Sequence, residues 1–349
     1  MRGFIRRRGD AWELRVFLGV DAVTGRKRYV GETVHGGKRE ADRELSRMVA
    51  DAEAGKLANT TATVGELLER WFALAQQDFS PKTVLETRGI LDRELLPGLG
   101  LVKLSKLKAE DIDAFYTRLR SKGGGRRGNG LVPSTIKRTH GVLRRALHQG
   151  VRWGWLGANP ATAASPPRVL CSDLRPPSPA ELGCLLDTAE RLNPELATLV
   201  VLSAASGARR SELLALRWTD IDLDARVVTI ARGLVMGNEG LVEKDTKTHQ
   251  ARSLSLDATT VSNLRAHRKR VLERVMACGR DVPADAFVFS SDGLGRSPML
   301  PDSTSRAFRR LCAHAGVSGV RLHDLRHYVA TRLLSAGVDV RTVAGRLAT

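Results

Sequence analysis

The sequence predicts a multidomain, mainly α-helical protein, and three observations support this. At 349 residues the chain is too long for one typical domain. Most apolar residues recur with helical spacing, whereas strand patterns are confined to the N-terminal region and the last third. Segments of linker composition lie at 59–63 and 161–179. We therefore expect a small α/β N-terminal module at 1–57, an all-helical domain at 60–165, and an α+β domain with a small antiparallel sheet at 175–349.

The N-terminal module combines strand and helix patterns. Residues 12–18 alternate well enough for a strand, a turn follows at 21–25, and a second strand begins at Arg28. A helix is expected over 38–54, with charges on one face and apolar residues on the other. Arginine-rich strands followed by a helix suit a module that binds a DNA groove, although a purely structural appendage would have the same pattern.

The helical domain is marked by good helix starts. Thr63 and Ser80 are favourable N-caps for two helices, and further helices are expected near 109–121 and 133–150. The glycine-rich segment 123–130 separates the last two helices. A basic, flexible segment of this kind suits a loop that contacts phosphates, and a solvated linker has the same composition.

Charge gives the first indication of function. The chain has 56 Lys and Arg against 38 Asp and Glu, a net charge of +18, which attracts polyanions such as DNA, RNA or an acidic membrane face. A generally basic protein is the alternative, but the charge is uneven: residues 103–152 hold 13 Lys and Arg against 3 Asp and Glu. The basic residues that we expect to contact DNA are Lys82, Arg126, Arg127, Lys137, Arg138 and Arg144.

Other functional classes are disfavoured. No apolar run is long enough to span a membrane, and the basic N-terminus leads into no apolar signal segment. The cysteines, at Cys171, Cys184, Cys278 and Cys312, form no CxxC pair and have no histidine at ligand spacing. We expect no metal, no other cofactor and no disulfide framework, as in a reducing cytoplasm.

The third domain is expected to be helical with one short sheet. Ser178, Pro179 and Glu181 mark the start of its first helix. A short antiparallel sheet is expected from strands at 227–230, 240–243 and 253–256. Helices are expected at about 257–277, 302–315 and 323–336.

A glycine-arginine stretch is the first candidate for chemistry. Gly207 permits a tight turn after a helix, and Arg209 emerges at the start of the next one. A helix N-terminus and a guanidinium would both favour an anion there. Glu212, one turn further on, could orient Arg209. An ordinary surface ion pair between these two residues is the alternative.

Two further stretches carry candidate site residues. Lys247 falls in an expected hairpin, from which a lysine can deliver a proton, although hairpin lysines are usually only solvated. A spacing of three puts His323 and Arg326 on one helical face, with His327 one turn from His323. A histidine pair at this spacing can bind zinc, but no third ligand is evident.

Together these stretches resemble the signature of the tyrosine recombinases, the phage-integrase family. The family's first motif is matched by Gly207, Arg209, Glu212, Leu216, Trp218, Asp220 and Ile221. Its hairpin lysine motif is matched by Lys247, Thr248 and Arg252. Its second motif is matched without a gap by His323, Leu325, Arg326, His327, Ala330 and Thr331. The N-terminal module and the helical domain correspond to the family's usual arm-binding module and SAM-like core-binding domain.

The resemblance implies site-specific DNA recombination, or integration, through a 3′-phosphotyrosine intermediate that needs neither ATP nor metal. It implies that Arg209 and Arg326 bind the phosphate oxygens, where negative charge increases in the transition state. Lys247 would protonate the leaving 5′ oxygen, and His323 would accept the nucleophile's proton or hold the phosphate. Glu212 and His327 would support them.

The implied partner is double-stranded DNA at attachment sites, which a homotetramer would bind if the C-terminus were complete. The implied location is the bacterial cytoplasm, at the nucleoid, for a protein encoded by a bacterium or phage.

The sequence departs from the family pattern near residue 349. Residues 343–347 enter the segment that precedes the family's tyrosine, but Ala348 and Thr349 stand where Gly and His are expected. The tyrosines are Tyr29, Tyr116 and Tyr328, and none matches the nucleophile position. We expect a C-terminally truncated recombinase that lacks its nucleophile, through a premature stop or a frameshift.

Two alternatives remain open at this point. One is a non-catalytic DNA-binding remnant that occupies recombination sites. The other is a type IB topoisomerase, which uses similar chemistry but is disfavoured by the N-terminal module and by the absence of a long clamp region.

Overall fold

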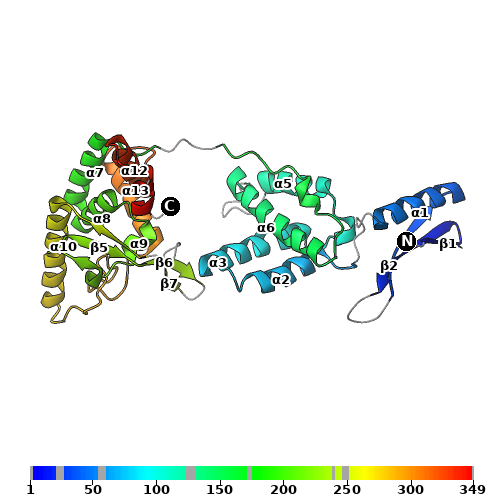
Figure 1. The fold of residues 1–349 in the computed structure, drawn as a ribbon, viewed down its shortest axis with the longest axis horizontal. Coiled ribbons are helices and arrows are strands. Elements are labelled where there is room, and N and C mark those ends of the chain that lie inside the picture. The colour runs from blue at the N-terminus through cyan, green and yellow to red at the C-terminus, as the bar shows by residue number, and fades with distance from the viewer. Residues whose placement is uncertain are drawn as a thin grey trace. The chain divides into compact units, whose positions relative to one another are not determined.

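The structure is a computed structural model in which the chain separates into two compact units, Met1–Cys171 and Ser172–Thr349 (Figure 1). The residues that it describes are 3–20, 27–53, 60–122, 130–170, 175–237, 240–245 and 251–347. The first unit contains two separate hydrophobic cores, one in the N-terminal module and one in the helical domain. The second unit has its own large core.

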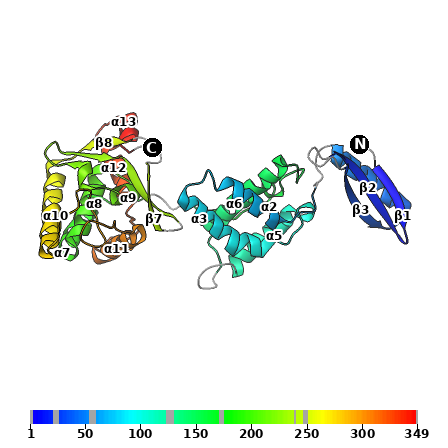
Figure 2. The same cartoon turned by 90° about the horizontal axis from the view of Figure 1, so that it is seen from below.

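The N-terminal module is a three-stranded antiparallel sheet with one helix packed against it. β1 (Gly3–Arg8), β2 (Ala11–Val20) and β3 (Lys27–His35) lie in the order β1-β2-β3, and Figure 2 shows β2 in the middle. α1 (Lys38–Glu53) contacts β1 and β2. Alternate residues of β2 point toward this helix. The buried residues of the resulting core are Leu14, Val16, Ala41, Met48 and Ala52.

β1 is a strand that the sequence pattern does not indicate. Three consecutive arginines, Arg6 to Arg8, place charge on both faces of the strand and hide the alternation that marks a half-buried strand. The pairing with β2 is nevertheless continuous from Gly3 opposite Val16 to Arg8 opposite Ala11. An edge strand tolerates such a sequence because most of its side chains stay exposed.

The helical domain begins at the N-cap that the sequence predicts. The hydroxyl of Thr63 accepts a hydrogen bond from the main-chain N–H of Glu66, and the carboxylate of Glu66 accepts one from the main-chain N–H of Thr63. Ser80 caps the next helix. The helices are α2 (Val64–Ala75), α3 (Pro81–Ile90), α4 (Leu96–Leu99), α5 (Ala109–Lys122) and α6 (Pro133–Arg152), with short 3-10 turns at Leu104–Lys106 and Pro160–Thr162. α6 crosses the centre of this domain and contacts α2, α3 and α5.

A π-helical turn, η1 (Leu91–Leu95), joins α3 to α4 in one continuous helix. Pro97 follows it, and proline has no N–H to donate back to the preceding turn, which favours such a local widening. Glu94 lies in this turn and is only 4% exposed. Its carboxylate accepts a hydrogen bond from Thr139 Oγ1 of α6 at 2.7 Å. Burial raises the pKa of Glu94 above its ordinary value.

The C-terminal domain is built around α8. This helix is apolar on nearly every side, and it contacts α7, α10 and α12 (Figures 1 and 2). Its first neighbour, α7, starts at Ser178 with a capping box to Glu181, as the sequence predicts. The helices are α7 (Pro179–Leu192), α8 (Pro194–Ser206), α9 (Arg210–Leu214), α10 (Ala258–Ala277), α11 (Pro301–His314), α12 (Asp324–Ser335) and α13 (Val340–Leu347).

The strands of this domain form two small sheets rather than the one expected sheet. β4 (Ile221–Asp222), β5 (Val227–Ile230) and β8 (Arg252–Ser255) pair in that order. β7 (Gly240–Asp245) instead pairs with β6 (Arg232–Gly237) in a separate hairpin, so the expected pairing of 240–243 was wrong. Glycines at both ends of β6 obscure its strand pattern in the sequence. β7 pairs with β6 because closing the short loop between neighbouring strands costs less entropy than closing a longer one.

The mainly helical class with small antiparallel sheets is confirmed. Among the residues that the structure describes, no helix combines the length and the apolar character that crossing a membrane would require.

Candidate active site

The turn between α8 and α9 brings Arg209 to the start of a helix. Gly207 ends α8 in the left-handed conformation, with φ of 64°. A Cβ atom at this position would lie 2.4 Å from Cδ2 of Leu347 in α13, so glycine satisfies both the conformation and the close approach. Arg209 then occupies the N-cap position of α9.

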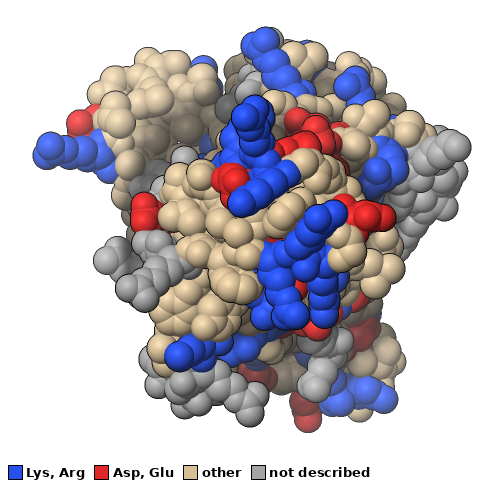
Figure 3. Space-filling model, turned by 90° about the vertical axis from the view of Figure 1, so that its right-hand side faces the viewer, with Lys and Arg blue, Asp and Glu red and all other residues tan. Residues whose placement is uncertain are grey.

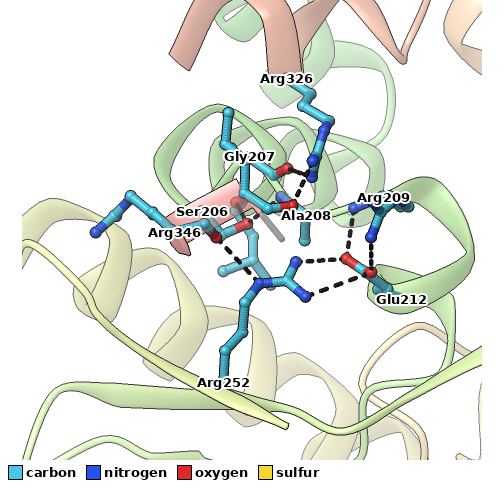
Figure 4. A network of polar contacts seen from close by, with 10 residues as sticks. Ser206, Gly207, Ala208, Arg209, Glu212, Arg252, Arg326 and Arg346 are labelled. Carbon is cyan, nitrogen blue, oxygen red and sulfur yellow. Dashed lines mark hydrogen bonds and ion pairs between the residues drawn. The ribbon is translucent and has the colours of Figure 1, made fainter. Parts of the chain in front are cut away.

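Glu212 is a buried carboxylate held by two arginines, and the residue is 2% exposed. Its Oε1 accepts a hydrogen bond from Arg209 Nη1 at 2.8 Å, and its Oε2 accepts one from the main-chain N–H of Arg209, also at 2.8 Å. Arg252 Nη2 donates to Oε2 at 2.6 Å (Figure 4). Burial acts to raise the pKa of Glu212, but the bonds from Arg252 and Arg209 outweigh it and hold the pKa below its ordinary value. Glu212 is therefore ionised at neutral pH.

Arg326 approaches the same turn from α12. The residue is 5% exposed, and its Nη1 donates to the carbonyl oxygen of Gly207 at 2.8 Å. Its Nη2 donates to the carbonyl oxygen of Leu347 at the end of α13. Burial and the nearby charge of Arg209 lower the pKa of Arg326 to about 10, which leaves the guanidinium charged at neutral pH. Figure 4 shows Arg209, Arg252 and Arg326 around the turn.

His323 lies next to this arginine cluster, which we define as Arg209, Arg252 and Arg326 with Glu212. The ring of His323 stands perpendicular to that of His327, with centroids 5.2 Å apart. Burial, followed by the charges of His327 and Arg326, lowers the pKa of His323. A histidine with a lowered pKa is neutral at neutral pH and can accept a proton.

Asp324 fixes the start of the helix that carries these residues. It is 1% exposed, and its carboxylate accepts hydrogen bonds from the main-chain N–H and the guanidinium of Arg321, both at 2.8 Å. Burial acts to raise the pKa of Asp324, but the bonds from Arg321 hold it below its ordinary value. A charged carboxylate in the first turn of a helix is favourable for the helix dipole.

The structure brings together Arg209, Glu212 and Arg326. His323 and His327, whose rings contact each other, lie at the start of the same helix as Arg326. Lys247 lies outside the described residues. It belongs to the segment that joins the two described strands β7 and β8.

Arg252, at the start of β8, is a member of the cluster to which the sequence assigned no role. The signal available was its position five residues after Lys247, but its carboxylate partner is 40 residues away along the chain and the spacing does not reveal it.

The basic residues expected to contact DNA are exposed wherever the structure describes them. These residues are Lys82 of α3 and Lys137, Arg138 and Arg144 of α6. Arg138 and Lys82 both lie near Glu86, at 3.2 and 3.8 Å. Lys137 and Arg144 are seven residues apart and therefore lie on one side of α6. The two remaining candidates, Arg126 and Arg127, lie outside the described residues.

The N-terminal module also exposes basic and aromatic side chains. On the face of the sheet away from α1, the rings of Phe17 and Tyr29 lie 5.4 Å apart, and Phe4 is 59% exposed. Arg6 and Arg15 are exposed on adjacent strands of the same face. Figure 3, viewed from the side on which Figure 1 draws β1 and α1, shows more Lys and Arg side chains than acidic ones.

The three tyrosines have different environments. Tyr116 is 3% exposed, and its hydroxyl is hydrogen-bonded to Nδ1 of His140 at 2.7 Å. Burial raises the pKa of Tyr116 well above its usual range. Tyr29 is 54% exposed on β3. Tyr328 packs against the core of the C-terminal domain, and it lies two residues after Arg326, roughly 200° around the helix.

Within the described ranges, no group of three or more His, Cys, Asp and Glu side chains is arranged to hold a metal ion. The positive groups of the arginine cluster are the guanidinium groups of Arg209, Arg252 and Arg326.

Comparison with known proteins identifies two regions of the chain. The model described as the phage integrase family matches residues 178–348, and the model of the phage integrase N-terminal SAM-like domain matches residues 63–120. A tyrosine recombinase XerC-like protein of Caldanaerobacter subterraneus subsp. tengcongensis is 24% identical over 345 residues, which cover 91% of this chain and 83% of that protein. An integrase of Streptomyces ambofaciens is 26% identical, with 95% and 84% covered.

Solved structures show the same fold. The Tn1549 transposon integrase in complex with a circular intermediate DNA has a TM-score of 0.68 at 19% identity, covering 82% of this chain and 92% of that one. A lambda integrase tetramer bound to a Holliday junction has a TM-score of 0.61 at 16% identity, covering 98% and 94%. The matched family models, over residues 63–120 and 178–348, together with the relatives that match more than nine-tenths of the chain, show that the chain belongs to the phage-integrase family of tyrosine recombinases.

Proposed function

We propose that this site-specific recombinase binds double-stranded DNA and holds the phosphodiester to be cut against Arg209 and Arg326. The observation that carries the proposal is the convergence of buried or half-buried guanidinium groups on the turn at 206–209 (Figure 4). A transferring phosphoryl group carries negative charge on its oxygens, and oriented guanidinium donors stabilise it without a metal.

His323 and Lys247 complete the proposed chemistry. His323, with its lowered pKa, would accept the proton of the attacking hydroxyl or hold a phosphate oxygen. His327 would support its ring, and Glu212 would orient Arg209. Lys247 would protonate the 5′ oxygen as it leaves, in keeping with the family motif that it matches. The phosphodiester energy would be kept in a 3′-phosphotyrosine link, so that ATP is not needed.

The DNA would be held by further surfaces in the first unit. In the helical domain at 60–165, the proposed phosphate contacts are Lys82, Lys137, Arg138 and Arg144, together with Arg126 and Arg127. The N-terminal module at 1–57 would bind a second DNA site with the open face of its sheet, where arginine and aromatic side chains alternate. Such contacts position the protein on DNA and make its affinity strongly dependent on salt.

We further propose that the nucleophile is not Tyr29, Tyr116 or Tyr328. The hydroxyl of Tyr116 is buried and already bonded to His140. Tyr328 points away from the helical face of Arg326, and Tyr29 belongs to the other compact unit. These environments also favour a second candidate function, a non-catalytic DNA-binding protein that occupies recombination sites.

A homotetramer on DNA is proposed because the lambda integrase relative forms a tetramer on a Holliday junction. Since its substrate would be bacterial or phage DNA, the protein would work at the nucleoid. The domain at 175–349 would then supply the groups that bind the phosphate to be cut. The N-terminal module and the helical domain would determine which DNA site is bound.

A nicked suicide duplex tests these proposals. The duplex carries a candidate attachment site taken from DNA that flanks the gene. The expected result is saturable binding without a covalent adduct on any of the three tyrosines. An adduct mapped by mass spectrometry to Tyr29, Tyr116 or Tyr328 would overturn the nucleophile proposal. Absence of binding at low salt would overturn the DNA-binding proposal itself.

A further inference from the structure

We infer that Arg252 is a positioning residue that acts through Glu212 to keep Arg209 available for a DNA phosphate. The inference rests on the proposed role of Arg209 and extends it to a residue without an assigned part in the reaction. Arg252 begins β8, and its side chain is 10% exposed.

The contacts of Arg252 join three separate segments. Its Nη2 and Nη1 donate to the two carboxylate oxygens of Glu212, at 2.6 and 3.4 Å. Its Nε donates to the carbonyl oxygen of Arg346 in α13 at 3.1 Å. The guanidinium thus has a fixed orientation between α9, β8 and α13. A planar, forked cation of this kind is well suited to hold a carboxylate in one orientation.

Glu212 is shared by two cations, and each makes its shorter side-chain bond to a different oxygen. Arg209 Nη1 contacts Oε1 at 2.8 Å, while Oε2 accepts from Arg252 and from the main-chain N–H of Arg209. If Arg252 were lost, the buried and still ionised carboxylate would have Arg209 as its principal charged partner. The guanidinium of Arg209 would then pair more strongly with Glu212 and less strongly with a phosphate, because a buried charge without enough partners is costly.

The charge balance leads to the same expectation. Arg209, Arg252 and Arg326 surround one carboxylate, which leaves the cluster with an excess of two positive charges. Removing Arg252 halves this excess. Removing the negative charge of Glu212 as well restores it, so the second substitution should repair the effect of the first.

The experiment uses the full chain and a short, fluorescein-labelled duplex of mixed sequence as the probe. Binding is measured over a series of salt concentrations, because the slope of log K against log salt counts the phosphates that are neutralised. The variants are Arg252→Met, Arg252→Lys, and Arg252→Met combined with Glu212→Gln. Arg209→Met is the reference. Arg265→Met is the matched control, since it removes one exposed charge from the same domain at a pair with Asp224.

Arg252→Met is expected to weaken binding about tenfold and to reduce the salt slope by about 0.9, as Arg209→Met does. Arg252→Lys should keep most of the wild-type slope, and the double variant should return toward it. Arg265→Met should keep the wild-type slope. Melting curves identify any variant that fails to fold. If Arg252→Met is such a variant, the lysine and double variants decide the question.

Two results would overturn the inference: a slope for Arg252→Met equal to that of Arg265→Met, or a double variant no better than Arg252→Met. If Arg252→Met does not fold, the other two variants test the inference. It would be overturned if either the double variant or Arg252→Lys had the same salt slope as Arg209→Met. If Arg209→Met itself leaves the slope unchanged, the proposed phosphate contact of Arg209 fails instead, so the two failures can be told apart.

Discussion

Two buried glutamates, one in the helical domain and one in the C-terminal domain, have pKa values shifted in opposite directions. Glu94 and Glu212 are 4% and 2% exposed. Glu94 has the hydroxyl of Thr139 as its hydrogen-bond partner, and burial raises its pKa. Glu212 lies between Arg209 and Arg252, and its pKa is lowered despite the same burial. Burial alone therefore does not decide the direction in which the pKa of a carboxylate moves, because cations bonded to the carboxylate can outweigh it.

The largest expected effect comes from Arg326, the most buried arginine of the cluster. In Arg326→Met, any strand cleavage that the protein supports, alone or in mixed complexes with a related recombinase, should fall by about 10²–10³, because one charged phosphate donor is lost. Nicking of a suicide duplex in such complexes measures this. DNA binding should weaken by no more than about tenfold. If Arg326→Met lost both its folded structure and DNA binding, Arg326 would have a structural role. The arginine cluster would then not differ in function from the buried site of Glu94.

Glu212→Gln should have the next largest effect, on stability. Removing the carboxylate leaves Arg209 and Arg252 facing each other without their shared counter-charge, which costs about 3 kcal/mol. Thermal unfolding with hydrogen exchange of peptides from α9 and β8 measures the loss. For wild type, the stabilisation should be present above the ordinary glutamate pKa of 4.5 and be lost as the pH falls through the lower, folded-state pKa. Unchanged exchange in α9 would show that the ion pairs are not stabilising.

Glu94→Gln should change the stability in the opposite direction. The folded-state pKa of Glu94 is raised, so its contribution is fully present below the ordinary value of 4.5 and is lost as the pH rises through the folded-state value. At neutral pH the neutral amide should therefore stabilise the helical domain by about 1 kcal/mol, and the gain should vanish in acid. Hydrogen exchange of α6 follows this change. A destabilised variant would mean that the carboxylate has a partner that matters more than Thr139.

Lys137→Gln is expected to have the smallest effect. This side chain is exposed on α6, so the melting temperature should not change. If it contacts one phosphate, the salt slope of DNA binding should fall by about 0.9, and the affinity should fall equally for all sequences. Fluorescence anisotropy over a salt series measures both. An unchanged slope would remove Lys137 from the proposed DNA surface.

Much of this architecture could be predicted from local patterns. The capping boxes at Thr63 and Ser178 are encoded within four residues, and the structure has them where the sequence places them. The partner of β7 could not be predicted, because a pattern of alternation does not specify which strand it pairs with. β1 was missed because its charges conceal its period.

The candidate site shows the same division between local and long-range information. Arg209 and Glu212 are three positions apart in the sequence, and helix geometry is enough to suggest that they pair. The bond from Arg252 to Glu212 spans 40 residues and depends on how β8 packs beside α9. The burial of Glu94 and its bond to Thr139 depend on the packing of the π-helical turn against α6, which no local pattern indicates.

The acceptors that hold Arg326 have a consequence for how this protein can evolve. Both are main-chain carbonyl oxygens, of Gly207 and Leu347, rather than side-chain groups. No exchange of one side chain for another can delete a carbonyl oxygen. Mutations can therefore remove these two hydrogen bonds only by replacing Arg326 itself or by moving the backbone that carries the two carbonyl oxygens.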